Sequence, residues 1–409
     1  MSDKPEAFYG LPQDVKFCKK CVISNQRPSS TVEFKNEKGE KKSVINFTED
    51  GVCSACVYHE EKELGIDWND RDERLRELLA RFKSKDGSYD VIVPGSGGKD
   101  SAYTAHILKY KYGMNPLTVT WAPHLYTDIG MKNFQEWMHT GGLDNILYTP
   151  NGKLHREMTR NAFHNLLHPF QPFIVGQRII GPAMAKRFGV KLVMYGENQA
   201  EYGNAIEENS NPIMKMDFFS AEEPLAMRFG GVSMEEYIAS GKYTKDDFAP
   251  YIAPPQEELI DAGVEVHYLG YYLKWDPQEC YYYAVDHTGF QANPVRTEGT
   301  YSKYSSIDDK IDPFHYFTTL IKFGIGRCTY DAAQEVRNGK ITREEAAYLV
   351  KKYDAEFPAK YFKEFLEYID TTEDEFWEVI DKHRSPHIWT QREGEWVLRH
   401  TVVSEGADD

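Results

Sequence analysis

The 409-residue sequence contains no run of 18 apolar residues, so it predicts no membrane-spanning helix. Its first ten residues, MSDKPEAFYG, have neither a basic start nor an apolar core, and we expect no secretory signal. An excess of basic residues is also missing, because 48 Lys and Arg stand against 64 Asp and Glu, for a net charge of −16. Broad binding to a nucleic-acid backbone needs a basic face. We therefore expect no nucleic-acid partner, no membrane partner and a cytoplasmic location.

Cysteine is scarce, with six in the chain, and four of them form two C-x-x-C pairs: Cys18, Cys21, Cys53 and Cys56. Two such pairs can supply four thiolates to one tetrahedral Zn²⁺. Between them, 31–36 and 43–48 are typical of strands, joined by the turn-like 37–42, and this predicts a structural zinc ribbon. An iron–sulfur cluster uses the same ligands and remains an alternative.

A glycine-rich stretch, VIVPGSGGKDSAYTA (91–105), has the pattern of a strand, a tight loop and a helix. Glycines let backbone amides converge, and a helix N-terminus adds free N–H groups and a positive dipole end, which together favour an anion. The loop comprises Gly95, Ser96, Gly97, Gly98, Lys99, Asp100 and Ser101. Asp100 follows Lys99 where a Walker A loop has Ser or Thr, and it also stands where a dinucleotide loop has its third glycine.

What stands is S-G-G-x-D-S, which resembles the PP-loop of the ATP pyrophosphatase superfamily. The resemblance implies that the loop holds the β,γ-phosphates of ATP and that the α–β bond is broken. The products would be an adenylated substrate and pyrophosphate.

Further strand patterns at 116–123, 146–150 and 191–198 alternate with helical patterns. This alternation predicts an α/β fold with a doubly wound, mainly parallel sheet, in which ligands bind at the carboxyl ends of strands. Thr120 and Trp121 follow the second strand, where the resemblance places adenosine, and Gly196, Glu197 and Asn198 follow the fourth. Glu197 and Asp100 are the candidate carboxylates for Mg²⁺.

Longer stretches look like the N-acetyl sugar amidotransferase family, the WbpG-type PP-loop enzymes of bacterial surface-polysaccharide biosynthesis. These stretches are TPNGKLHREMTRNAF, HPFQPFIVGQR, YGENQAEYGN, RTEGTYSKYSSIDDKIDPFHYF and IKFGIGRCTYDAAQEVRNGKITREEA. The resemblance implies an ATP-dependent, AMP-forming amidotransferase of lipopolysaccharide biosynthesis. A sugar acetamido oxygen would attack the α-phosphate, and ammonia would then displace AMP to leave an acetamidino group on a UDP- or CMP-linked sugar.

Neither Cys280 nor Cys328 lies in a glutaminase-like motif, so we expect ammonia to come from a partner. The resemblance suggests a glutaminase with a cyclase-type barrel, similar to the histidine-pathway pair. The polar stretch 293–312 is the candidate sugar site, with Arg296, Glu298, Thr300, Tyr301, Lys303, Asp308, Asp309 and Lys310. The candidate catalytic residues are Lys99, Asp100, Glu197 and Arg327.

The chain divides into four predicted parts. These are a four-cysteine zinc ribbon (1–60), a linker helix with its apolar stripe at Leu75, Leu78, Leu79 and Phe82 (61–88), a PP-loop ATP-binding domain (89–270) and a mainly helical substrate-binding region (271–409). Two alternatives remain. A PP-loop enzyme that thiolates tRNA would usually need a further cysteine pair, and a non-catalytic scaffold would not need the intact loop.

Overall fold

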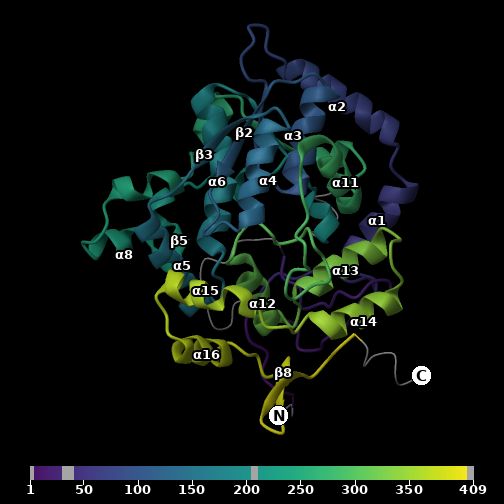
Figure 1. Cartoon of the computed structure of the whole chain (residues 1–409), viewed down its shortest axis with the longest axis vertical. Coiled ribbons are helices and arrows are strands. Elements are labelled where there is room, and N and C mark those ends of the chain that lie inside the picture. The colour runs from purple at the N-terminus through teal and green to yellow at the C-terminus, as the bar shows by residue number, and fades with distance from the viewer. Residues whose placement is uncertain (1–3, 30–40, 204–210, 403–409) are drawn as a thin grey trace.

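The centre of the molecule is a five-stranded parallel sheet with the strand order β3-β2-β1-β4-β7 (Figure 1). The computed structural model describes residues 4–29, 41–203 and 211–402. The nine strands of these residues are β1 (Val91–Pro94), β2 (Pro116–Trp121), β3 (Asp144–Tyr148), β4 (Leu192–Tyr195), β5 (Arg228–Phe229), β6 (Val232–Ser233), β7 (Glu265–Tyr268), β8 (Trp389–Arg392) and β9 (Glu395–Leu398). The predicted fold class is confirmed, since the sheet is parallel throughout.

Fifteen α-helices accompany these strands in the part of the chain that is described. They are α1 (Ser54–Leu64), α2 (Trp68–Phe82), α3 (Lys99–Tyr110), α4 (Asp128–His139), α5 (Gly152–Leu166), α6 (Gln171–Phe188), α8 (Met234–Ala239), α9 (Gln256–Asp261), α10 (Leu269–Tyr272), α11 (Pro277–Thr288), α12 (Asp312–Phe323), α13 (Arg327–Arg337), α14 (Arg343–Tyr353), α15 (Phe362–Ile369) and α16 (Glu373–Lys382). Short 3₁₀ segments are η1 (Gln199–Tyr202), η2 (Met216–Phe218), η3 (Pro224–Ala226), η4 (Lys245–Tyr251) and η5 (Ala359–Tyr361).

The strand order places the switch point of the sheet between β1 and β4. From β1 the chain adds β2 and then β3 on one side, and it returns to add β4 and β7 on the other. Loops that leave β1 and β4 therefore diverge and open a crevice at the carboxyl ends of these strands. Three of the predicted strands correspond to β2, β3 and β4, whereas β7 was not predicted from the sequence.

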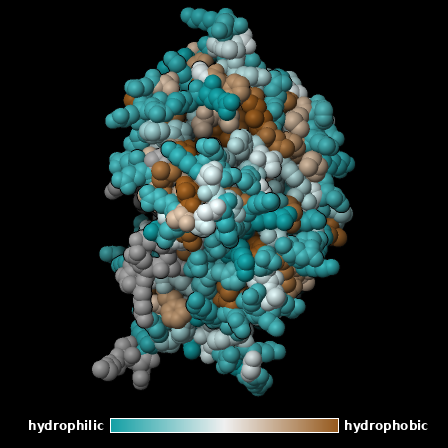
Figure 2. Space-filling view, turned by 90° about the vertical axis from the view of Figure 1, so that its left-hand side faces the viewer, coloured by the Kyte–Doolittle hydropathy of each residue, from teal (hydrophilic) through white to brown (hydrophobic). Residues whose placement is uncertain are grey.

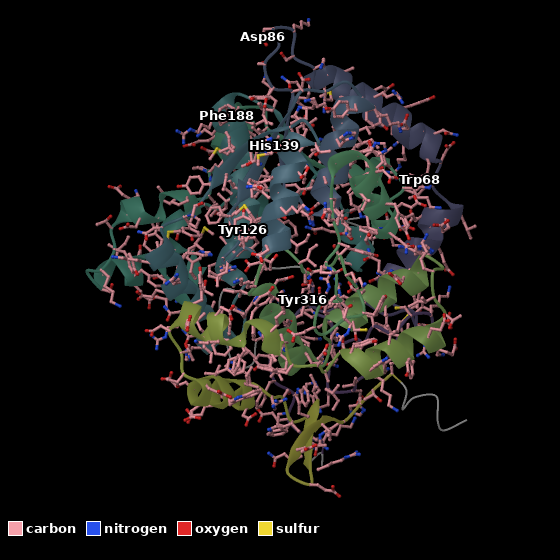
Figure 3. All side chains as sticks on the ribbon, viewed as in Figure 1. Trp68, Asp86, Tyr126, His139, Phe188 and Tyr316 are labelled. Atoms are coloured by element: carbon pink, nitrogen blue, oxygen red, sulfur yellow. The ribbon has the colours of Figure 1, made fainter. Side chains whose placement is uncertain are left out.

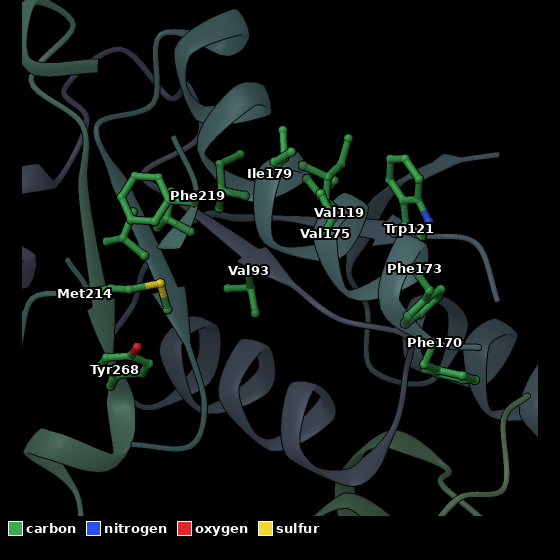
Figure 4. Close-up of a cluster of buried hydrophobic side chains, with 14 of the residues drawn as sticks. Val93, Val119, Trp121, Phe170, Phe173, Val175, Ile179, Met214, Phe219 and Tyr268 are labelled. Atoms are coloured by element: carbon green, nitrogen blue, oxygen red, sulfur yellow. The ribbon is translucent and has the colours of Figure 1, made fainter. Parts of the chain in front are cut away.

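Helices α3 and α6 pack on the sheet and bury its apolar strands. Every residue of β1 and β2 is buried, as is typical of a parallel sheet that is covered on both faces. Val93, Val119, Val175 and Ile179 belong to one large core, which includes Trp121 and the aromatic pair at 170 and 173 (Figure 4). This continuous core holds the loops after β1 and β4 on a rigid base.

The amino-terminal part is built from short backbone pairings. Residues 43–45 pair with 27–29, and 46–48 pair with 52–54 around a turn at Gly51. The predicted strand 31–36 lies outside the described residues. The predicted strand 43–48 is wrong as a single regular strand, because its two halves bond to different segments. The second cysteine pair also begins a helix, α1, that the sequence did not indicate, and the linker helix is α2.

A second, smaller core joins this amino-terminal part to the helical hairpin of α13 and α14. The four paired cysteines, Val22 and Ile23 pack with Ala332, Ala333, Ala346 and Ala347. The guanidinium Nε of Arg343 donates to the carbonyls of Cys18 and Cys21 at 3.3 and 3.2 Å. The cysteine pairs thus lie against the carboxy-terminal helices, far away in the sequence.

The carboxy-terminal region is mainly helical and ends in the β8–β9 hairpin (Figure 1). Capping boxes at Thr342–Glu345 and Thr372–Glu375 begin α14 and α16. The stretch 289–311 contains neither helix nor strand. The domain boundaries stay predictions. Among the described residues, none of the helices is both long and apolar enough to cross a membrane.

Candidate active site

The loop between β1 and α3 is shaped by glycines that no larger residue could replace without movement. A Cβ on Gly95 would lie 2.1 Å from the Cβ of Ser101. Gly97 has φ +83°, and a Cβ there would lie 2.8 Å from the Cα of Phe134. Gly98 is the N-cap of α3 and makes no side-chain cap hydrogen bond, so the first amides of the helix face the crevice. This geometry suits an anion.

The segment after β4 lies beside this loop because β1 and β4 are neighbours in the sheet. A Cβ on Gly196 would lie 2.7 Å from the Trp275 ring. The side chain of Asn198 caps η1 by accepting from the Ala200 amide at 3.1 Å. Between them, Glu197 accepts hydrogen bonds from the Tyr202 hydroxyl and, at 3.2 Å, from Gln334 of α13. Glu197 is thereby fixed opposite the loop.

A cavity of about 480 Å³ lies between the carboxyl edge of the sheet, the amino-terminal part, α12 and α13. Tyr316, labelled in Figure 3, lines it from the side of the carboxy-terminal helices. All four predicted catalytic residues line it together: Lys99, Asp100, Glu197 and Arg327. The cavity therefore joins residues that are more than 200 positions apart.

Charges of both signs face each other in this cavity. Lys99 Nζ lies 2.5 Å from Asp100 Oδ2. Burial and the Asp100 carboxylate raise the pKa of Glu197 to about 7. Burial opposes the charge of Lys99, but the carboxylates of Asp100 and Glu197 outweigh it and raise the pKa of Lys99. Such mutually perturbed groups in a cavity are typical of functional sites.

The carboxylates fit a magnesium ion. The second oxygen of Asp100, Oδ1, is buried and has no hydrogen-bond partner within the described residues. Glu197 supplies another carboxylate on the facing wall. Mg²⁺ binds proteins through one or two carboxylates and completes its shell with phosphate and water oxygens, as this arrangement permits.

Arg327 opens α13 and is held in place by two neighbours. Its guanidinium lies 3.1 Å from Asp331 Oδ1 and donates to the Tyr316 hydroxyl. Thr300 donates to the same Asp331 at 2.7 Å but is itself buried and does not line the cavity. The neighbouring hydroxyl of Tyr301 faces Glu335.

Two adjacent aspartates of the 293–312 stretch differ in position. Asp308 lies near Ser96 of the glycine loop, and burial raises the pKa of its carboxyl. Asp309 turns away and accepts from His124 Nδ1 at 2.8 Å and from the Ile311 amide at 2.9 Å. Asp308 therefore lies beside the glycine loop, whereas Asp309 fixes the stretch 293–312 to the segment that follows β2.

Several other candidates are engaged outside the cavity. Arg296 forms a bidentate pair with Glu356 at 2.6 Å, and Glu298 accepts from the Lys360 amide. Lys303 Nζ donates to the Pro294 carbonyl, and Lys310 pairs with Glu364 at 3.7 Å. Thr120 and Trp121 are buried within β2 and do not line the cavity. The structure does not bring these six residues to the loop, and their binding roles stay predictions.

Sequence reasoning missed part of the cavity wall. Arg27, Tyr202, Tyr316, Asp331 and Gln334 line it but lie on four different segments. All but Arg27 belong to the stretches that resemble the amidotransferase family, but nothing in those stretches distinguishes them from their neighbours. Only the folded chain brings the five residues together.

The four paired cysteines form one compact, buried group. Their Sγ atoms lie within 4.8 Å of one another, with 3.8 Å between Cys18 and Cys56 and 3.7 Å between Cys21 and Cys53. A tetrahedral ion with metal–sulfur bonds of about 2.3 Å requires sulfurs about 3.8 Å apart. Backbone amides of residues 20, 21 and 53 point at Cys18 Sγ. This spacing fits a single tetrahedral ion.

Comparison with known proteins bears on the carboxy-terminal region. Residues 298–402 match the family described as LPS biosynthesis protein WbpG-like, C-terminal domain. This region is a WbpG-like C-terminal domain. The resemblance to the WbpG type that the sequence indicated is thereby confirmed. The WbpG-like region contains α13, so it supplies Arg327, Asp331 and Gln334 to the cavity wall.

Other similarities are partial. An uncharacterized protein of Methanocaldococcus jannaschii, MJ1599, is 31% identical over 78 residues, 19% of this chain and 27% of that protein. The match thus spans about a quarter of the length of this curated relative.

Three solved structures are similar to the chain at a low level. An NH3-dependent NAD synthetase from Campylobacter jejuni is 15% identical, with a TM-score of 0.26, over 32% of this chain and 56% of that one. An NMN synthetase from Francisella tularensis is 12% identical, with a TM-score of 0.29, over 70% and 94%. The U34-tRNA thiolase NcsA from Methanococcus maripaludis, with its [4Fe-4S] cluster, is 13% identical, with a TM-score of 0.30, over 78% and 89%. At these TM-scores the similarities do not bear on activity.

Proposed function

We propose that this WbpG-like protein is an ATP-dependent amidotransferase that converts an N-acetyl group of a UDP- or CMP-linked bacterial surface sugar into an acetamidino group. One observation carries the proposal. The S-G-G-x-D-S loop and Glu197 open onto the same cavity that the WbpG-like domain closes through Arg327. A phosphate loop and a sugar-pathway domain thus share one space.

In the proposed reaction, the acetamido oxygen attacks the α-phosphorus of ATP, and the bond between the α- and β-phosphates breaks. Pyrophosphate leaves, and the sugar amide becomes an O-adenylated imidate. Ammonia then adds to the former carbonyl carbon, the carbon–oxygen bond to AMP breaks, and one proton is released. The oxygen of the acetamido group ends on AMP, so no water is consumed.

The residues of the cavity contribute by placement and charge rather than by covalent catalysis. The amides of Gly97 and Gly98 and the start of α3 would bind the departing phosphates, with Lys99 beside them. Arg327 would balance charge on the opposite wall. Mg²⁺, held by Asp100 and Glu197, would neutralise the charge that develops on the phosphate oxygens.

We also propose that ammonia comes from a partner, a glutaminase with a cyclase-type barrel. The two cysteines outside the C-x-x-C pairs are both buried: Cys280 is 2% exposed and Cys328 is 0% exposed. Burial raises the pKa of each thiol. A thiol that is shielded and protonated does not attack glutamine, so neither of these two cysteines is a suitable nucleophile for that step.

We propose Zn²⁺ as the ion of the four-cysteine cluster. Four thiolates at tetrahedral spacing, all buried and without an open position, are typical of structural zinc. The cluster would then fix the amino-terminal part against α13 and α14.

The central test is incubation with ATP, Mg²⁺, an ammonium salt and a panel of UDP- and CMP-linked N-acetyl sugars, followed by high-resolution mass spectrometry. Exchange of one oxygen for NH in a sugar, with equimolar AMP and pyrophosphate, is the expected result. Lys99→Ala and Asp100→Ala should abolish it, and the exposed Lys85→Ala should not. AMP release that requires tRNA and ignores every sugar would refute the proposal in favour of tRNA modification.

A further inference from the structure

Arg27 is a buried cation in the wall of the cavity. Its residue is 6% exposed, and its guanidinium lies 5.5 Å from the centres of the Tyr202 and Tyr330 rings. Its Nη1 donates to the carbonyl of Tyr202. A guanidinium carries five N–H donors and remains charged in proteins. Its environment therefore leaves both charge and donor capacity for a further partner.

Three cations of the cavity wall have carboxylate partners, unlike Arg27. Lys99 pairs with Asp100 at 2.5 Å, Arg327 with Asp331 at 3.1 Å and Lys340 with Asp276 at 3.3 Å. Within residues 4–29, 41–203 and 211–402, Arg27 has no carboxylate within ion-pair distance.

Among the cations of the cavity, Arg337 acts on the charge of Arg27. Burial lowers the pKa of Arg27, and the like charge of Arg337, which also lines the cavity, lowers it further. An anion bound in the cavity against these two guanidinium groups would offset their repulsion. Guanidinium groups bind phosphate oxygens in a bidentate way, which makes a phosphoryl group the best match.

The position of Arg27 places this anion beside the reacting groups. Tyr202, whose ring and carbonyl contact Arg27, donates its hydroxyl to Glu197. Glu197 in turn faces Lys99 and Asp100 of the glycine loop. Arg27, Glu197 and the loop residues Lys99 and Asp100 all line this one cavity, so a phosphate chain bound at the loop extends into the space that Arg27 borders.

The cysteine-bearing part of the chain determines where Arg27 lies. Arg27 stands between the two cysteine pairs, and its carbonyl accepts from the Ile45 amide at 2.9 Å. Ser54, next to Cys53, donates to the Gly203 carbonyl at 2.7 Å, which fixes this part to the segment that carries Tyr202. Tyr330 comes from α13 of the WbpG-like domain. All three parts of the molecule therefore meet at Arg27.

We propose that Arg27 is a phosphate-binding residue of the cavity, supplied by the four-cysteine part of the chain. The proposal rests on the proposed function for the identity of its two phosphate sources, which are ATP and the diphosphate or monophosphate of the sugar nucleotide. The cysteine cluster accordingly has a direct part in forming the site, because it holds the segment that presents Arg27.

The test measures binding by calorimetry at constant salt, with pyrophosphate, a non-hydrolysable ATP analogue, UDP-N-acetylglucosamine and a CMP-linked N-acetyl sugar as separate probes. Arg27→Gln should weaken at least one probe by about 10- to 100-fold, the loss expected for hydrogen bonds to a charged group. Arg27→Lys keeps the positive charge but loses the bidentate donor geometry of the guanidinium group, so its affinity should lie between those of the wild type and Arg27→Gln. If only pyrophosphate and the ATP analogue bind more weakly, Arg27 binds the phosphates of ATP. If only the two sugar nucleotides bind more weakly, Arg27 binds the phosphates of the sugar nucleotide.

The matched control is Arg74→Ala, an exposed arginine paired with Asp70 on α2, which should bind every probe like the wild type. Without ligand, Arg27→Gln should melt at the wild-type temperature or above it, since it removes a buried charge that lacks a carboxylate. Wild-type affinities in Arg27→Gln, or a large loss of ligand-free stability with unchanged affinity, would overturn the proposal and make Arg27 a structural residue.

The two proposals can fail separately. Phosphate binding that depends on Arg27, without amidine formation from any sugar, would refute the proposed function and keep this inference. Amidine formation from a sugar at an unchanged rate in Arg27→Gln and Arg27→Lys would keep the proposed function and refute this inference. A wild-type protein that binds none of the four probes would overturn both.

Discussion

The raised pKa of Glu197 predicts how the stability of the ligand-free protein depends on pH. Burial, with the Asp100 carboxylate second, moves this pKa from 4.5 to about 7. Below pH 4.5 the carboxyl is neutral in both the folded and the unfolded chain, so folding carries no charge penalty there. As the pH rises through 7 the folded protein must hold a charged Glu197 in the cavity, and that part of its stability is lost.

The magnitude follows from the same values. At about 1.36 kcal/mol per pKa unit, the difference corresponds to at most about 3 kcal/mol, and water in the cavity reduces it because Glu197 is only partly buried. An unfolding entropy of about 2.1 cal/mol/K per residue converts this to about 3–4 °C in Tm for a chain of 409 residues.

The assay is thermal unfolding at pH 5 and pH 8.5 without ATP and magnesium. Glu197→Gln should match the wild type within error near pH 5 and melt up to about 3–4 °C higher at pH 8.5. Asp312, with a pKa also raised by burial to about 7, contributes to the wild-type curve, but the difference between variant and wild type isolates Glu197. The exposed Glu73→Gln is the control. A Tm difference that stays constant from pH 5 to 8.5 would refute the reasoning.

Three further outcomes are expected. Gly97→Ala forces a positive φ and a contact of 2.8 Å with the Phe134 backbone, so the KM for ATP should rise at least tenfold in a pyrophosphate-release assay, and an unchanged KM would contradict the loop geometry. Cys53→Ser should lose a zinc equivalent by atomic emission, whereas the buried Cys328→Ser should retain it; equal zinc in both would exclude the cluster. Lys62→Met leaves Glu201 buried without its partner at 2.8 Å and should cost about 3–5 kcal/mol in denaturant unfolding, most of which Lys62→Met combined with Glu201→Met restores.

The surface adds little to the assignment of function. On the face drawn in Figure 2, hydrophobic residues form small separate groups among hydrophilic ones. This agrees with the net charge of −16 and a mean hydropathy of −0.60. The information on function is concentrated in the cavity, where the sheet, the cysteine pairs and the WbpG-like domain meet.

Local patterns predicted the elements whose chemistry is contained in a short stretch. The glycine loop needs six consecutive residues, and its shape follows from the missing side chains at positions 95 and 97 together with the helix start that follows. The capping boxes of α14 and α16 and the buried stripe of α2 are equally local. The weaker predictions concerned pairing partners, as in 43–48, because hydrogen bonds between segments depend on neighbours that lie elsewhere in the sequence.

The sequence by itself determined the strand–loop–helix course of the glycine stretch, the α/β class and the grouping of the four paired cysteines, since each follows from a local residue pattern. Only the tertiary structure decided which polar residues share the cavity. Asp308 and Asp309 are adjacent, yet Asp308 lies near Ser96 whereas Asp309 bonds to His124, because the folded course of this irregular stretch gives each side chain different neighbours. Arg27 entered the site for the same reason: the packing of the cysteine pairs on α13 brings it there, and no spacing in the sequence encodes that contact.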